Sequence, residues 1–132
     1  MTIKNLLAHS KLWFTLALLW TATVTFLCLV SMKELPSLVV SGLDKYVHFT
    51  FHFIFTMLWM FYVNSRKIID DKSILKVVFA SLIFGITIEI LQELLTITRK
   101  ADLKDVLANF TGAIIAAILF KYFYIKMFQR NT

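Results

Sequence analysis

The sequence predicts an all-α integral membrane protein, a four-helix transmembrane bundle with both termini in the cytoplasm. Hydrophobic residues make up 59% of its 132 residues, there are only three Gly and one Pro, and the mean hydropathy is +0.77. This composition lies well outside that of a soluble domain. Four long apolar segments alternate with short charged ones, as expected for helices that cross a bilayer and return. We expect one domain over residues 1–132, with helices at about 12–30, 44–63, 74–95 and 103–124.

The first predicted span covers residues 12–30, nineteen positions without a charged side chain. At 1.5 Å per residue a helix of this length extends about 28 Å, close to the hydrocarbon thickness of a bilayer. A cleaved signal peptide has a similar basic flank, here Lys4 and Lys11. It also has a shorter apolar run and a small-residue cleavage site, which residues 31–36 lack. We therefore expect an uncleaved transmembrane helix.

The other three spans follow after short polar connections. Pro36 and Gly42 indicate a loop before the second span. The charged segment 64–73 is short, as a connection between antiparallel helices should be. Residues 126–132 form a basic tail after the fourth span. These alternating elements predict an up-and-down arrangement.

The distribution of Lys and Arg predicts the orientation. Nine of them flank the termini and the second connection, and five lie in the first and third connections. By the positive-inside rule both termini are then cytoplasmic. The net charge of +6 does not indicate nucleic-acid binding, because the basic residues stand beside apolar runs and not on a polar face. Membrane lipids are the expected partners, and Cys28, alone in an apolar run, suggests neither a disulfide nor a metal motif.

In this topology, unusual polar residues of three helices fall at the same membrane face. Helical spacing places them in one stripe per helix. The stripes are Asp44, His48 and His52; Glu89, Gln92 and Glu93; and Asp105 and Asn109. An ionised side chain in a membrane helix costs roughly 2.5–3.5 kcal/mol on insertion scales, so it usually faces a partner or water. The stripes therefore predict a shared polar cleft that opens away from the cytoplasm.

Structural interpretations of these residues stay open beside the functional one. Asp44, Asp102 and Asp105 suit helix caps, because an acidic side chain accepts backbone N–H groups at a helix N-terminus. Glu89 with Arg99 suits an ion pair within the bundle, and Glu93 suits a solvated helix end. His48 and His52 suit histidines satisfied inside the bundle. Small residues suit close helix packing, namely Gly85, Gly112, Ala113, Ala116 and Ala117.

Metal and covalent chemistry receive little support from the sequence. A metal site drawn from His48, His52, Glu89 and Asp105 is a weak signal, because the two histidines lack the acidic neighbour of a zinc-hydrolase helix. No Gly-x-Ser-x-Gly motif and no phosphate-binding glycine loop are present. We therefore expect neither a metal nor a cofactor.

Three elements resemble the VanZ-like membrane proteins, in the same order along the chain. They are Asp44-Lys45-x-x-His48-Phe49, Glu89-x-x-Gln92, and Arg99-x-x-Asp102-x-x-Asp105-x-x-x-Asn109-x-x-Gly112. The four-span layout resembles that family over nearly the whole chain. His52 departs from it, since an aromatic residue such as Tyr is common there, and Ala116 stands where a second glycine is common. The resemblance implies a small bacterial membrane protein whose founding relative is linked to teicoplanin resistance.

We expect the polar cleft to bind or act on an amphiphile of the bacterial envelope, namely a lipid headgroup, a lipid-linked cell-wall precursor or a lipoglycopeptide. Arg99 and Lys45 would meet anionic groups, and in an enzymatic version His48 or Glu89 would be the general base. A structural or accessory subunit is the alternative. The resemblance implies the bacterial cytoplasmic membrane, and the sequence predicts no particular oligomeric state. The candidate site residues are Asp44, Lys45, His48, Glu89, Gln92, Arg99, Asp102, Asp105 and Asn109.

Overall fold

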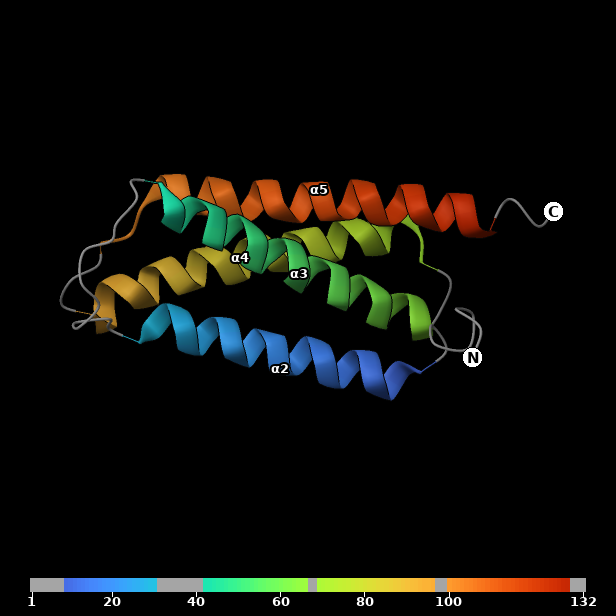
Figure 1. Ribbon diagram of the computed structural model, residues 1–132, viewed down its shortest axis with the longest axis horizontal. Coiled ribbons are helices and arrows are strands. Elements are labelled where there is room, and N and C mark those ends of the chain that lie inside the picture. Colours follow the sequence, from blue (N-terminus) through green and yellow to red (C-terminus); the bar gives the residue numbers. More distant parts are fainter. Residues whose placement is uncertain (1–8, 31–41, 67–68, 97–99, 129–132) are drawn as a thin grey trace.

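The computed structural model describes residues 9–30, 42–66, 69–96 and 100–128, and these form four α-helices without a strand. All four helices are long and apolar enough to cross a membrane, which confirms the predicted all-α membrane bundle. Neighbouring helices in the chain run in opposite directions (Figure 1). The helices are α2 (Ser10–Leu29), α3 (Leu43–Arg66), α4 (Asp71–Leu95) and α5 (Leu103–Phe128).

The connection between α3 and α4 is shorter than the segment 64–73 predicted from the sequence. Helix α3 continues through Arg66 and α4 begins at Asp71. The carboxylate of Asp70 accepts a hydrogen bond from the backbone N–H of Ser73, at 2.8 Å. Asp70 is thus the N-cap of α4, and this cap starts the helix three residues before its apolar run.

The topology brings distant segments together at one end of the bundle. The end of α2, the start of α3, the end of α4 and the start of α5 all lie at the left of Figure 1. The start of α2 and the end of α5 lie at the opposite end. This arrangement is the one that the predicted polar stripes require. The cytoplasmic location of the termini stays a prediction from the charge count.

Helices α3 and α5 pack most closely, and small residues of α5 permit the approach. A Cβ atom added to Gly112 would lie 3.2 Å from the backbone nitrogen of Phe53 and would contact the carbonyl of Phe49. Ala113 and Ala116 are fully buried on the same helix. The predicted role of these small residues in helix packing is confirmed. The close contact sets the start of α5 beside the start of α3.

Helix α2 packs on α3 and α4 and exposes much of its apolar side, including Leu18, Leu19 and Phe26. Exposed apolar side chains of this kind suit contact with lipid. The indole N–H of Trp20 donates to the backbone carbonyl of Phe51, at 3.0 Å. This hydrogen bond ties α2 to α3, as polar side chains commonly do between membrane helices.

Candidate functional site

A cluster of charged and polar side chains occupies the end of the bundle where α3, α4 and α5 meet. We call it the polar cluster and define it by Asp44, Lys45, His48, Glu89, Asp102, Asp105 and Asn109. Asp44, Lys45 and His48 belong to the first turns of α3, and Glu89 lies six residues before the end of α4. The remaining three belong to the start of α5 or the residue before it. Helical periodicity and the antiparallel topology therefore bring together residues up to 65 positions apart.

Lys45 forms the outer part of the polar cluster with three carboxylates. Its Nζ atom lies 2.8 Å from Asp44, 3.2 Å from Asp102 and 3.0 Å from Asp105. The side chains of Lys45, Asp44 and Asp102 are partly exposed, at 32%, 49% and 38%. Exposed pairs contribute little singly, but this network joins the start of α3 to the start of α5.

His48 forms the inner part with two carboxylates and an amide. Its Nδ1 atom lies 3.2 Å from Oδ1 of Asn109 and 3.6 Å from Oε1 of Glu89. Its Nε2 atom lies 3.9 Å from Oδ2 of Asp105. All four residues are buried, so groups that strongly prefer water are held in the interior of an apolar bundle.

Asp102 caps α5 and supports Glu89 at the same time. Its carboxylate accepts a hydrogen bond from the backbone N–H of Lys104, at 2.8 Å, and its own backbone N–H donates to Oε2 of Glu89, at 3.2 Å. The capping interpretation is confirmed for Asp102. The Lys104 N–H hydrogen bond, with the nearby Lys45 ammonium, lowers the pKa of Asp102 from its ordinary value of 3.8. This carboxyl group is therefore ionised at neutral pH.

Asp44 and Asp105 are acidic residues of the first turns of α3 and α5. Both contact Lys45, and Asp105 also lies beside His48. An acidic side chain at either position is stabilised by the partial positive charge of the helix N-terminus. The side chain of Asp105 is only 11% exposed, against 49% for Asp44. Asp105 therefore belongs to the interior as well as to the network around Lys45.

Other residues of the predicted stripes face elsewhere. His52 lies one turn further along α3, and its Nδ1 atom is 2.8 Å from Oγ of Ser81. Gln92 donates from Nε2 to the backbone carbonyl of Cys28, at 2.9 Å. Glu93 is exposed, and Arg99 lies outside the described residues. The grouping of His52 with the other metal candidates is thus wrong, and the expectation of a satisfied buried histidine is confirmed for it.

Sequence reasoning missed the partners of His52 and Gln92. Ser81 is one of several hydroxyl residues in apolar segments, and the acceptor for Gln92 is a backbone carbonyl of α2. No side-chain pattern indicates either contact. Gln92 therefore acts as a link between α4 and the end of α2, although the sequence grouped it with the candidate site.

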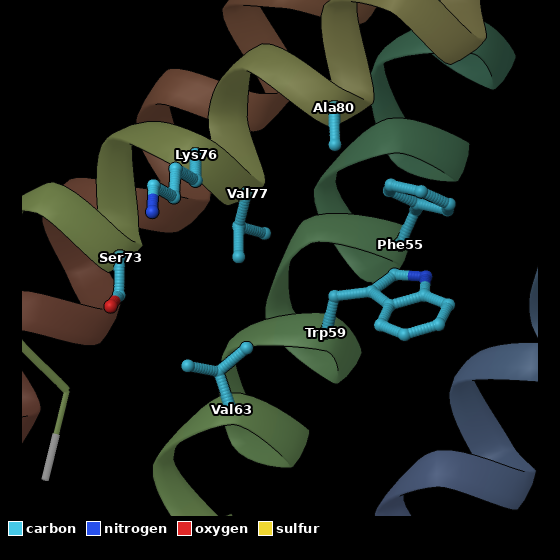
Figure 2. A pocket seen from close by; sticks show the side chains of 7 residues that line it. All are labelled: Phe55, Trp59, Val63, Ser73, Lys76, Val77 and Ala80. Carbon is cyan, nitrogen blue, oxygen red and sulfur yellow. The ribbon is translucent and has the colours of Figure 1, made fainter. Parts of the chain in front are cut away.

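The inner part of the polar cluster is closed in this structure, with Asn109 at 1%, Glu89 at 2% and His48 at 4% exposure. Two cavities lie elsewhere and have mainly apolar walls. One, of about 430 Å³, lies between α3 and α4, and Figure 2 shows Phe55 and Trp59 of α3 facing Val77 and Ala80 of α4 across it. The other, of about 590 Å³, lies between α4 and α5. Neither is lined by a residue of the polar cluster.

Four apolar spans, with an ionic cluster at the end of the bundle where α3, α4 and α5 meet, define a multi-pass α-helical membrane protein. The family model described as VanZ/LLP1 matches residues 2–125. The chain therefore belongs to the VanZ-like family, as the three sequence elements indicated. A search of curated proteins and a search of solved structures each found no match.

Proposed function

We propose that this VanZ-like protein binds the polar headgroup of an envelope amphiphile at the polar cluster. The amphiphile is a membrane lipid, a lipid-linked cell-wall precursor or a lipoglycopeptide such as teicoplanin. The observation that carries the proposal is the shared ion pairing of Lys45 with three carboxylates at the end of a membrane bundle. A group of charged side chains costs free energy when a helix inserts into the membrane. Charged residues within spans therefore typically mark ligand or ion sites.

The depth of the cluster supports a division of roles. The Lys45 ammonium is partly exposed and exchanges its contact with Asp44 or Asp102 for an anionic group of the ligand. Asn109 is a buried amide whose Nδ2 atom has no hydrogen-bond partner among the described residues, so it offers a donor to the headgroup. Arg99 is proposed as a second cationic contact on the basis of the family element alone. Gln92 supports the bundle through Cys28.

The proposed location is the bacterial cytoplasmic membrane, with the polar cluster on its outer side. The charge count supports this orientation, since nine of the fourteen Lys and Arg residues belong to the terminal segments and the second connection of the sequence. An outward-facing cluster meets the headgroups of the outer leaflet and any envelope molecule inserted there. Resistance to a lipid-bearing glycopeptide is one activity that such binding supports.

A membrane enzyme acting on envelope lipids is the second candidate, and the surroundings of His48 favour it. The imidazole lies between two carboxylates, at 3.6 Å from Glu89 and 3.9 Å from Asp105. A histidine oriented by a carboxylate is a common general base. In this version His48 or Glu89 removes a proton from water or from a hydroxyl group of the lipid.

The test is teicoplanin susceptibility of a Gram-positive host that expresses the protein. We expect the wild type to raise the inhibitory concentration and the variants Glu89→Gln and Asp105→Asn to lose this protection at equal membrane abundance. Glu93→Gln is the matched control, because it changes an exposed carboxylate four residues from Glu89 on the same helix. Glu89→Gln and Asp105→Asn preserve the size of the side chain and remove only its charge.

Two other results would count against the proposal. Loss of folded protein in Glu89→Gln and Asp105→Asn would indicate a structural lock of the bundle. Full protection by both variants would exclude the polar cluster from the activity. Turnover of a purified envelope lipid by the wild type and not by the variants would favour the enzyme over the binding protein.

A further inference from the structure

The polar cluster contains a set of donors suited to a metal ion. His48, Glu89 and Asp105 each offer one ligand atom, and these three atoms lie within 4.8 Å of one another. The residues come from α3, α4 and α5, so one ion would join three helices. We propose that His48, Glu89 and Asp105 form a binding site for a divalent transition-metal cation, Zn²⁺ or Mn²⁺. The site departs from the expectation of no metal, and it does not depend on the proposed function.

The hydrogen bonding of His48 leaves one of its nitrogen atoms available. Oδ1 of Asn109 accepts hydrogen bonds and lies 3.2 Å from Nδ1, so a neutral imidazole donates through its Nδ1–H. Nε2 then carries a lone pair and faces Oδ2 of Asp105, at 3.9 Å. Two acceptors face each other in this tautomer, and a bound cation between them would stabilise the arrangement. In metal sites, a histidine usually binds the ion through one ring nitrogen while a hydrogen bond holds the other.

The spacing also suits ligands of a metal ion. A distance of 3.9 Å is too long for a hydrogen bond. Ligands bound to Zn²⁺ at about 2.0 Å lie roughly 3.3 Å apart in a tetrahedral site, and opposite ligands of an octahedral ion lie roughly 4.2 Å apart. The three ligand atoms lie within 4.8 Å of one another, so small side-chain movements would bring them to these separations.

Glu89 supplies an independent indication of a missing partner. Its side chain is 2% exposed, and its Oε1 atom has no hydrogen-bond partner among the described residues. Its other oxygen accepts from the backbone of Asp102. Buried carboxylate oxygens are rarely left without a donor or a cation. The unpartnered oxygen is the one directed at His48.

The charge balance of the described residues favours a cation. Glu89, Asp105, Asp102 and Asp44 supply four carboxylates, and Lys45 is the only ammonium that the described part of the chain places within 4.0 Å of them. Lys45 also divides its contacts among three of the four. A divalent ion beside Glu89 and Asp105 offsets the two charges that are most deeply buried.

The donor set indicates which ions fit. One imidazole nitrogen and two carboxylate oxygens suit Zn²⁺ or Mn²⁺, whereas Ca²⁺ and Mg²⁺ prefer oxygen alone. Three protein ligands also leave a coordination position open, as in catalytic metal sites. Asp105 is the ligand closest to the partly exposed Lys45, so it connects the proposed metal site to the outer part of the cluster.

The first test measures metal binding by the purified full-length protein, without an affinity tag, in lipid nanodiscs. After removal of metal by a chelator, Zn²⁺ or Mn²⁺ alone is titrated, and bound metal is measured by calorimetry and elemental mass spectrometry. We expect about one ion per chain. Glu89→Gln and Asp105→Asn should weaken binding by at least about tenfold, since even outer-shell changes cost 10–100-fold. Glu93→Gln should bind as the wild type does.

A second measurement needs no variant and so does not depend on variant folding. X-ray absorption of the Zn²⁺-loaded wild type should show nitrogen and oxygen ligands with one imidazole. A sulfur ligand, or two or more imidazoles, would overturn the assignment, as would undetectable binding of both ions or unchanged binding by the two variants. These assays contain no amphiphile, so metal binding and teicoplanin protection succeed or fail separately.

Discussion

Replacing Gly112 by alanine should destabilise the bundle by separating α3 from α5. An added Cβ would lie 3.1 Å from the carbonyl carbon of Phe49 and 3.2 Å from the nitrogen of Phe53. Both are backbone atoms of α3, so no side chain can rotate away and the helices themselves must move. Overpacking costs about 1–3 kcal/mol, and the helix propensity of alanine returns at most about 1 kcal/mol. We expect the free energy of unfolding to fall by about 1–2 kcal/mol.

The assay is reversible unfolding in detergent followed by circular dichroism. Thr111→Ala is the matched control, because it creates the same side chain one position away at an exposed site. Gly112→Ala should also weaken the activities of the polar cluster, since Asp105 and Asn109 lie on the same helix and must stay opposite Lys45 and His48. A Gly112→Ala protein as stable as the wild type, to within about 0.5 kcal/mol, would refute the close approach of the two backbones.

Two further changes test the contacts around the cluster. Gln92→Leu removes the donor to the Cys28 carbonyl and should lower the free energy of unfolding by about 0.5–1.5 kcal/mol, measured in the same assay; no loss would show that this bond does not hold α2. The pKa of Asp102 is lower in the folded protein than its ordinary value of 3.8. The ionised carboxylate therefore stabilises the fold fully at pH values above 3.8. This stabilisation is lost as the pH falls from that value through the folded pKa. Acid titration of Asp102→Asn, whose amide can still cap α5, should therefore show less loss of stability below this pH than the wild type, and identical acid profiles would contradict the assigned role.

The fold was predictable because each span carries its own signal. An uncharged run of about twenty residues is long enough to cross a bilayer whatever it packs against, and the short connections leave an antiparallel arrangement as the simple solution. Helix ends were less predictable. Asp70 shows why, since a cap depends on one hydrogen bond that the hydropathy of the segment does not register.

The candidate site was predictable in outline because residues four apart on a helix share a face. The same rule failed for His52. With 3.6 residues per turn, four residues advance the direction of a side chain by about 40°, so His48 faces α5 and the end of α4 while His52 meets Ser81. Gln92 comes three residues after Glu89, so its side chain points in a direction rotated the opposite way around α4. It reaches the backbone carbonyl of Cys28 on α2. Which neighbouring helix lies in each direction depends on the packing, and the spacing of polar residues does not encode that.

The remaining choice is between a polar cluster that holds the bundle and one that acts on a ligand. The helices already have dedicated links, namely Trp20 to Phe51, Gln92 to Cys28 and the contact at Gly112. Replacing a buried ion pair by apolar side chains is often neutral or stabilising, so a lock does not need three carboxylates around one lysine. Among the described residues, the carboxylate of Glu89 makes no contact with Lys45 and keeps an oxygen without a hydrogen-bond partner at 2% exposure, which raises the cost of folding. That cost is accounted for if a cation binds beside Glu89 and Asp105, and the metal content of the purified protein tests this account.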